Sequence, residues 1–401
     1  MSEKNVNRRQ FLKTTAGVFS SFAATGLSSS KLFAKESYDT VRIGYLPITD
    51  ATPLLVAHGN GYFSEEGLKV LPPVLIRSWS ALSESFLSGK FNVTHLLFPI
   101  PVWMRYNIKA PVKVIAWDHI NGSALTVSND SGINSFADLG GKKIAVPHWY
   151  SMHNIILQAG IRKMGLTPVI QSQDIPLKPH EVNLFILPPP DMPLSLAGKK
   201  IDGYIVAEPF NAIGEVKINA RILRFTGDIW KNHPCCVVVM NEDIIKRYPI
   251  FTQKVTNAIV RAQRWILENP LKTAHMLSRE GNRYLPVQED ILKRVFTLYD
   301  PEIYSKNKSA AAIRHPEWQV KRIGFQPYPF PSATRYIINE MGQTRMEGDT
   351  RFLKTLDPDF AVTDLVNDSF VKKAILSAGG PSFFDNLSTA NPWEREEVIE
   401  L

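Results

Sequence analysis

Short apolar runs alternate with helix-like stretches along the chain as far as Met240. Each run is too short for a buried helix and has the length of a buried strand. The runs that we interpret as strands are Val41–Leu46, Val70–Leu75, Val93–Phe98, Val112–Ala116, Ala124–Val127, Lys143–Val146, Leu184–Leu187, Ile201–Val206 and Ile222–Phe225. Stretches with helical patterning lie between them, notably Pro53–His58, Ser80–Leu87 and His153–Met164. This alternation predicts an α/β fold built on a mainly parallel sheet.

Helices dominate after Val237–Met240. The expected helices are Ile244–Arg247, Phe251–Glu268, Leu271–Arg279, Val287–Tyr299 and Ala333–Met341. In the second of these, Val255, Ile259, Ala262 and Ile266 form an apolar stripe that needs a partner surface. No low-complexity linker separates this helical part from the rest of the chain.

The stretch from Leu184 to Asn211 is typical of a strand, a Pro-rich turn, a short helix and a second strand. Asp191 can cap the helix and Gly198 can end it. Both strands then end at the same edge of the sheet, where ligands bind in open α/β folds. This places Glu208 as a charged group at the mouth of a cleft, with Phe210 beside it. The alternative is a solvated glutamate in an ordinary loop.

Two further strand ends carry polar or aromatic residues. Thr49 and Asp50 follow the first strand and precede a helix, and side-chain capping alone would explain Asp50. Trp79 begins the helix after the second strand, where Ser78 serves as the N-cap. An indole at this position is expected to be exposed, so we treat Trp79 as a candidate ligand contact.

Two more candidates lie around the next strands. Gly122 and Ser123 precede the strand at Leu125, where backbone N–H groups can face a ligand. His153 begins a helix directly after the strand Ile144–Val146. The positive end of a helix dipole favours an anion there. A structural role is the alternative for a lone histidine.

Composition bounds the class of protein. With 401 residues, 44% hydrophobic and 21% charged, the chain is typical of a two-domain globular protein. Residues 1–34 carry five basic residues and Glu3, so half of the formal charge of +8 belongs to this segment. The remaining basicity does not indicate a nucleic-acid partner.

Cys235 and Cys236, the only cysteines, are too few for an iron–sulfur cluster, and we expect buried free thiols rather than a strained disulfide.

The N-terminal segment has the pattern of an export signal. Arg8 and Arg9 precede Phe-Leu-Lys and a weakly apolar run from Thr14 to Leu27, and Ala34 offers a small residue for cleavage. We expect residues 1–34 to be a twin-arginine signal peptide that directs the folded protein to the periplasm. A disordered basic tail is the alternative.

No catalytic motif is present: the chain lacks Gly-x-Ser-x-Gly, a phosphate loop and His-Glu-x-x-His. Hydroxyls, an indole, an imidazole and a carboxylate after different strands suit the hydrogen bonding of a small polar ligand. We therefore predict a binding protein rather than an enzyme, with no catalytic residues, no cofactor and no metal site.

The chain also resembles a known family of binding proteins. The residues that carry the resemblance are Gly44–Asp50, Gly61–Phe63, Ser88–Lys90, His95, Asp138–Lys143, Asp202–Gly203, Glu208–Phe210 and His233–Cys236. They resemble the solute-binding proteins of ABC importers in the nitrate/sulfonate/bicarbonate group, whose fold is shared with pyrimidine-precursor binding and synthase proteins. In the nitrate and bicarbonate branch the ligand lies between lobes, near residues that match Trp79, Ser123, His153 and Glu208. Phe210 stands where that branch usually has Trp.

The resemblance implies a two-lobed periplasmic-binding-protein fold of type II. Lobe one would comprise residues 38–123 plus 237–400, and lobe two residues 124–236. The chain would cross twice, near Ser123–Val127 and Cys235–Val239, with the helix-rich C-terminal part packed on lobe one. Ligand binding would then close the lobes about these crossings.

The implied function is to capture a small polar solute and deliver it to an ABC permease in the inner membrane, as a monomer. Two alternatives remain: an enzyme of the pyrimidine-precursor synthase type, and the ligand-sensing subunit of a periplasmic sensor. A carboxylate such as Glu208 would repel a bare anion by about 4 kcal/mol at 4 Å and an effective dielectric of 20. Three resolutions are open: a cation or metal neutralises Glu208, its hydrogen bonds hold the turn together away from the ligand, or the ligand offers N–H or O–H donors. Trp79 and Phe210 favour the third, since aromatic rings enclose an organic body better than a hydrated ion. We therefore predict an organic solute with at least one donor group, with nitrate or bicarbonate as runner-up.

Overall fold

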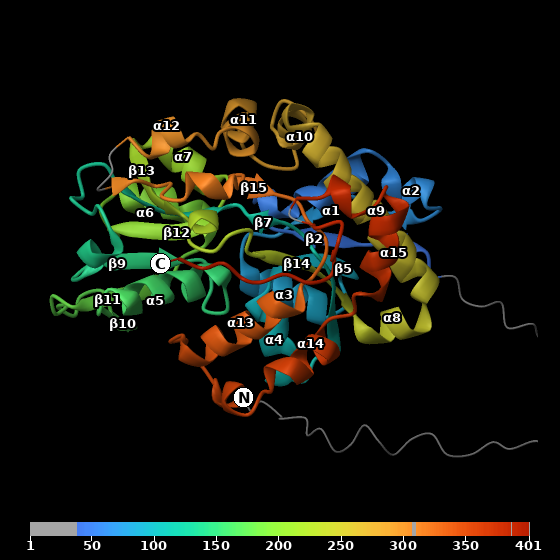
Figure 1. Ribbon diagram of the computed structural model, residues 1–401, viewed down its shortest axis with the longest axis horizontal. Coiled ribbons are helices and arrows are strands. Elements are labelled where there is room, and N and C mark those ends of the chain that lie inside the picture. Colours follow the sequence, from blue (N-terminus) through green and yellow to red (C-terminus); the bar gives the residue numbers. More distant parts are fainter. Residues whose placement is uncertain (1–37, 307–309, 386, 401) are drawn as a thin grey trace, which may run out of the picture. The chain divides into compact units, whose positions relative to one another are not determined.

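The computed structural model describes residues 38–306, 310–385 and 387–400 (Figure 1). The expected twin-arginine segment lies outside this range. The chain from Tyr38 onward forms one unit with two large sheets and helices around them. Among the helices of the described residues, none combines the length and the apolar character that crossing a membrane requires.

One sheet has five strands in the order β4-β2-β5-β14-β6. Its strands are β2 (Ile43–Tyr45), β4 (Val74–Leu75), β5 (Val93–Leu97), β6 (Val112–Trp117) and β14 (Cys236–Asn241). β14 comes from far along the chain and runs antiparallel between β5 and β6. The carboxyl ends of β2 and β6 therefore lie at the same edge as the amino end of β14.

The second sheet has six strands in the order β10-β11-β9-β12-β8-β13. Its strands are β8 (Ser123–Ser128), β9 (Lys143–Val146), β10 (Thr167–Val169), β11 (Glu181–Ile186), β12 (Gly203–Ala207) and β13 (Ala220–Phe225). β8 runs antiparallel to both of its neighbours, while the other pairings are parallel. The α/β prediction is confirmed, but each sheet contains an antiparallel strand that the sequence did not reveal.

The chain passes between the two sheets along two adjacent segments. β7 (Ile120–Asn121) leads into β8 and pairs with β15 (Ile323–Gly324). The returning segment forms an isolated bridge from Pro234 to Ile120, and the amide of Asn121 donates to the carbonyl of His233 at 2.9 Å. A small two-stranded sheet of β1 (Thr40–Val41) and β3 (Lys69–Val70) lies at the start of the unit.

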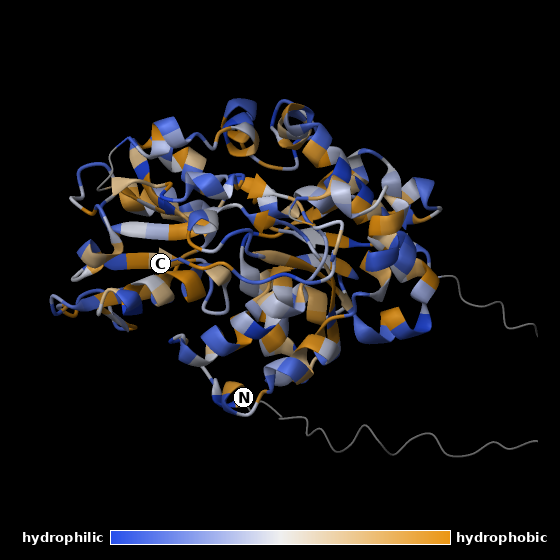
Figure 2. Ribbon diagram, viewed as in Figure 1, coloured by the Kyte–Doolittle hydropathy of each residue, from blue (hydrophilic) through white to orange (hydrophobic). Residues whose placement is uncertain are grey.

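Helices surround the sheets. They are α1 (Thr52–Gly59), α2 (Tyr62–Glu65), α3 (Trp79–Leu87), α4 (Pro99–Tyr106), α5 (Met152–Lys163), α6 (Met192–Ala197), α7 (Phe210–Lys217), α8 (Glu242–Arg247), α9 (Pro249–Glu268), α10 (Pro270–Leu277), α11 (Glu289–Thr297), α12 (Pro301–Tyr304), α13 (Pro331–Gln343), α14 (Pro358–Leu365) and α15 (Ser369–Ser377). Hydrophobic and hydrophilic residues alternate around the outer helices (Figure 2). The predicted stripe of α9 is buried at Val255, Ile259, Ala262 and Ile266, where the helix packs on α1, α2 and α15.

The helical C-terminal part contacts the helices of both sheets. Besides the packing of α9 on α1, α11 contacts α7 and α13 contacts both α4 and α5. Arg162 of α5 pairs with Glu340 of α13 at 2.6 Å, and Gln158 accepts the amide of Arg345 at 2.8 Å. The C-terminal part thus contacts helices beside both sheets, whereas the sequence predicted that it packs on lobe one.

Helix caps match the sequence in some places and not in others. Ser78 caps α3 as predicted, since its hydroxyl accepts the amide of Ala81. Ser151 caps α5 in the same way. The prediction that Asp191 caps α6 is wrong: the 3-10 turn Pro189–Asp191 precedes the helix, and the Asp191 side chain accepts no capping hydrogen bond.

Candidate functional site

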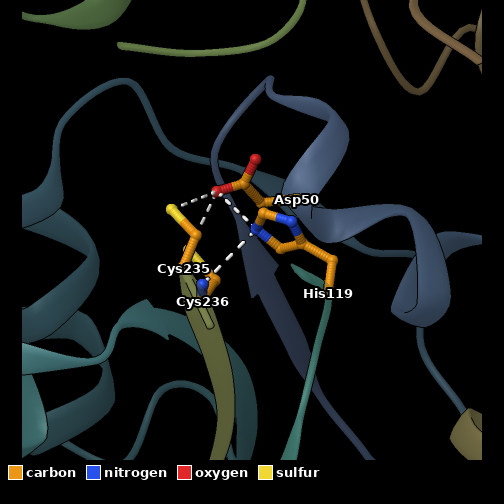
Figure 3. A group of neighbouring side chains, drawn as sticks. All are labelled: Asp50, His119, Cys235 and Cys236. Atoms are coloured by element: carbon orange, nitrogen blue, oxygen red, sulfur yellow. Dashed lines mark hydrogen bonds and ion pairs between the residues drawn. The ribbon is translucent and has the colours of Figure 1, made fainter. Parts of the chain in front are cut away.

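A buried group of four side chains lies at the edge of the five-stranded sheet. Asp50 belongs to the 3-10 turn η1 (Thr49–Ala51), between β2 and α1. His119 follows the end of β6, and Cys235 and Cys236 stand at the start of β14. The strand directions described above explain why residues so far apart in the sequence point toward one another (Figure 3). We call these four residues the donor cluster.

One carboxylate oxygen lies at the centre of the donor cluster. Oδ2 of Asp50 is 2.9 Å from Nε2 of His119 and accepts the Cys236 thiol at 3.0 Å and the Cys235 thiol at 3.7 Å. None of the four side chains is exposed to solvent. The prediction that capping explains Asp50 is wrong, because its carboxylate is used here and not at a helix end. The expectation of buried free thiols is confirmed.

Burial and mutual contact shift the pKa of each member. Burial raises the pKa of the Asp50 carboxyl, although His119 opposes the rise. Burial opposes the charge of His119, yet the Asp50 carboxylate raises the pKa of this imidazole well above its usual range. Burial raises the pKa of Cys236, whereas its hydrogen bond to Cys235 and the imidazole of His153 outweigh burial and lower the pKa of Cys235. The pKa of each of these buried groups thus depends on the charge of its neighbours in the donor cluster.

More unpartnered polar atoms surround the donor cluster. Both carboxylate oxygens of Asp118 are buried without a hydrogen bond among the described residues, and its Oδ2 lies 3.9 Å from Nδ1 of His95. His95 accepts the amide of Leu46 through Nε2, and burial lowers its pKa to about 3. The ring of Trp79 packs edge-on against His95 at 5.4 Å, and its indole N–H also lacks a partner. A ligand of suitable shape could satisfy these atoms.

The six-stranded sheet supplies the opposite side of this region. Ser123 begins β8, and His153 lies in the first turn of α5. The Ser123 hydroxyl and Nε2 of His153 are 2.9 Å apart, and the same hydroxyl is 3.8 Å from the Cys235 thiol. Within the part of the chain that the structure describes, Nδ1 of His153 has no hydrogen-bond partner. Buried polar groups from both sheets therefore meet at the crossing segments.

Glu208 occupies a different position from the one predicted. Its carboxylate is 1% exposed and forms a salt bridge with Arg322, at 2.6 Å from Nη2 and 2.7 Å from Nε. Its second oxygen accepts the amide of Ala212 at 3.0 Å. The placement at an open cleft mouth is therefore wrong. The Glu208 backbone links the two sheets, since its carbonyl accepts from Thr49 and its amide donates to Gly122.

The aromatic candidates are both buried. Trp79 is 2% exposed, so the expectation of an exposed indole is wrong. Phe210 begins α7 at 6% exposure, and its carbonyl accepts the hydroxyl of Tyr204. The structure thus connects Thr49, Asp50, Gly122, Ser123, His153 and Glu208 through contacts, with Trp79 joined through His95. Contact of any of these residues with a ligand remains a prediction.

A surface hollow of about 400 Å³ adjoins this region. Ser83 lines it one turn along α3 from Trp79, and aromatic walls come from Trp103 of α4 and from Trp149 and Tyr150 before α5. The indole of Trp149 donates to Glu347 at 3.0 Å. The hollow therefore joins elements of both sheets and the C-terminal part.

Sequence reasoning missed His119, Asp118 and Arg322. Asp118 and His119 follow directly after the strand Val112–Trp117, the same signal that singled out Asp50. Cys235 and Cys236 were recognised as thiols but not as neighbours of Asp50. Nothing in the pattern around Arg322 indicates its burial or its partner.

Comparison with known proteins defines the family. The model of the NMT1-like family matches residues 34–278. The chain belongs to this family. It is 28% identical over 244 residues to the nitrate/nitrite binding protein NrtA of Nostoc sp. PCC 7120, an alignment that covers 56% of this chain and 53% of NrtA. The chain thus spans about half the length of this relative, and 34% of the nitrate import ATP-binding protein NrtC of Synechocystis sp. PCC 6803 at 27% identity.

Solved structures of similar shape establish the fold. The periplasmic nitrate-binding protein NrtA from Synechocystis PCC 6803 matches this member of the NMT1-like family with a TM-score of 0.69 and 16% identity, covering 90% of this chain and 94% of NrtA. The alkanesulfonate-binding protein SsuA from Xanthomonas axonopodis pv. citri matches with a TM-score of 0.58 and 15% identity, covering 82% and 99%. The predicted periplasmic-binding-protein fold is confirmed.

Proposed function

We propose that this chain is the solute-binding component of an ABC importer, acting in the periplasm without catalysis. The observation that carries the proposal is the meeting of unpartnered buried polar atoms from both sheets beside the two crossing segments. Binding proteins of this fold hold a ligand where two lobes face each other. Membership of the NMT1-like family and similarity to NrtA support the same role.

The lobes in this proposal are residues 38–123 plus 237–400 and residues 124–236. The strands of the six-stranded sheet lie within the second range apart from Ser123, the first residue of β8, and β14 returns the chain to the five-stranded sheet. The crossing segments would act as hinges, and an ABC permease would receive the solute from a monomeric protein. Export by the twin-arginine route, directed by residues 1–34, belongs to the same proposal.

The favoured solute is a small organic molecule with at least one donor group. Glu208 no longer supports this choice, because Arg322 already neutralises it. Asp118 supports it instead: both of its oxygens lack hydrogen-bond partners within residues 38–306, 310–385 and 387–400 and can accept from a donor. The aromatic hollow beside Trp103, Trp149 and Tyr150 suits an organic body. Nitrate and bicarbonate are the runners-up.

The test is a ligand screen by thermal unfolding, covering nitrate, nitrite, bicarbonate, taurine, alkanesulfonates, pyrimidines and amidines. A solute at about 100 times its Kd should add roughly 2.7 kcal/mol to the free energy of unfolding. Ser123→Ala and His153→Gln should weaken the response, whereas the exposed Ser88→Ala serves as a matched control. If protein shown by mass spectrometry to be free of ligand responds to no solute, the proposal fails.

A further inference from the structure

The donor cluster has the chemistry of a transition-metal site. It combines one carboxylate, one imidazole and two thiols, and the four ligand atoms all lie within 4.8 Å of one another. Asp50 and His119 come from the first part of the chain, and the cysteines come from the returning strand β14 (Figure 3). Cys235 and Cys236 both direct their sulfur atoms at the same carboxylate oxygen.

The spacing is close to that of a tetrahedral ion. Zinc bonds of about 2.0–2.3 Å place neighbouring ligand atoms about 3.3–3.8 Å apart. The contacts from Asp50 to His119 and to the two thiols run from 2.9 to 3.7 Å. The remaining ligand atoms also lie within 4.8 Å of one another, so the four side chains surround a common centre.

The local charge also favours a cation. Asp50 and Asp118 are fully buried, and in the described part of the chain their ion-pair partners are the histidines His119 and His95. No lysine or arginine forms a salt bridge with either carboxylate among those residues. Burial raises the pKa of both carboxyls, and a nearby divalent ion would favour their ionised form, for which the described residues supply only imidazoles.

The ligand types select the metal. Two thiols exclude Mg²⁺ and Ca²⁺, which prefer oxygen ligands. An iron–sulfur cluster would need more thiolates than the chain's two cysteines offer. A set of one oxygen, one nitrogen and two sulfur ligands with four positions suits Zn²⁺.

We propose that Asp50, His119, Cys235 and Cys236 bind one Zn²⁺ ion. Oδ2 of Asp50, Nε2 of His119 and the two Sγ atoms would be its ligands. The ligand atoms must be deprotonated to bind the ion, so binding strengthens as pH rises. The ion would fix the start of β14 to the ends of β2 and β6, next to Ser123. This inference concerns a resident ion and holds whether or not the chain serves an importer.

The experiment begins with metal-free protein, to which Zn²⁺ or Co²⁺ is added. We expect binding of one ion per chain, with thiolate-to-cobalt charge transfer and the intense visible bands of tetrahedral Co²⁺. Because the chain has only two cysteines, a thiol reagent reports on the donor cluster alone. Both thiols should react in the metal-free protein under mild denaturant and be protected by Zn²⁺, a readout that needs no variant.

Variants identify the ligands. Cys236→Ser and His119→Gln should each weaken Zn²⁺ binding by more than about 100-fold, since even outer-shell changes cost 10–100-fold. His58→Gln is the matched control, because His58 bonds Tyr284 outside the donor cluster and should leave binding unchanged. No stoichiometric Zn²⁺ binding, or thiol reactivity that Zn²⁺ does not alter, would overturn the proposal. A solute screen with negative outcome would leave the zinc result standing, so the two failures are distinguishable.

Discussion

Arg322 neutralises a buried carboxylate, and removing it should be among the most destabilising single changes in the chain. Its guanidinium is 1% exposed and bonds Glu208, while Nη2 also reaches Glu215 at 3.0 Å. Arg322→Met leaves Glu208 buried with one amide donor. Breaking a buried pair in this way costs about 3–5 kcal/mol. Glu215 suffers less, because Arg294 and Tyr304 still bond it.

The partner substitution should be milder. Glu208→Gln leaves Arg322 bonded to Glu215 and to the Tyr304 hydroxyl at 3.0 Å, so we expect a cost of about 1–3 kcal/mol. The double variant should be more stable than Arg322→Met alone, because no unpaired charge remains. Arg294→Met is the matched control: it touches the same network from a partly exposed position and should cost about 1 kcal/mol or less.

Urea unfolding followed by circular dichroism measures these differences from the midpoint at constant m-value. Equal stability of Arg322→Met and wild type would refute the reasoning, as would a double variant worse than both single ones. Glu208→Gln also decides the role of this residue in binding. If the folded variant keeps its affinity for the solute found in the screen, Glu208 is structural; a loss of more than about tenfold would restore it as a ligand contact.

Three further outcomes are expected. Arg8→Lys with Arg9→Lys should leave precursor in the cytoplasm, and unchanged periplasmic yield on immunoblots would exclude twin-arginine export. Stability should fall on acidification, because burial lowers the pKa of His95 to about 3 and of His233 to about 4, below the 6.5 of the unfolded chain. The contribution of these neutral imidazoles to the free energy of unfolding is fully present above pH 6.5. Below that, each histidine loses up to about 1.4 kcal/mol per pH unit down to its folded pKa. The free energy of unfolding should therefore be lower at pH 5 than at pH 7, and His233→Gln should reduce this difference. Ile259→Ala in the buried stripe of α9 should cost about 2–5 kcal/mol in urea unfolding, and a cost below 1 would contradict the packing of α9.

The strand and helix pattern predicted most of the fold because buried positions are apolar and recur with the period of the strand or helix. Apolar runs located most strands of both sheets, and the stripe of α9 is buried as expected. The run Val70–Leu75 instead contains parts of two strands, β3 and β4, and β10 was missed. The direction of a strand is not encoded in its apolar pattern. A strand buried on both faces is continuously apolar whichever way it runs, so β8 and β14 could not be recognised as antiparallel.

The site was predictable only as far as strand ends reveal it. Asp50, Ser123 and His153 were found because each follows or begins an element, and the structure brings them to one region. Partners from distant parts of the chain could not be found in this way. Arg322 stands 114 positions after Glu208, and no local pattern connects a carboxylate with an arginine so far along the chain.

The place of β14 in the sheet also determines the order in which the chain can fold during synthesis. Among the named strands of the described residues, β14 is the one neighbour of β6, and Cys236 follows His119 by 117 positions. We therefore expect β6 to remain unpaired until β14 has been synthesised, whereas all strands of the six-stranded sheet lie between Ser123 and Phe225. The sheet encoded second can close first, and the sheet encoded first closes last. The nascent chain thus gains its two cysteines and its last central strand in the same step.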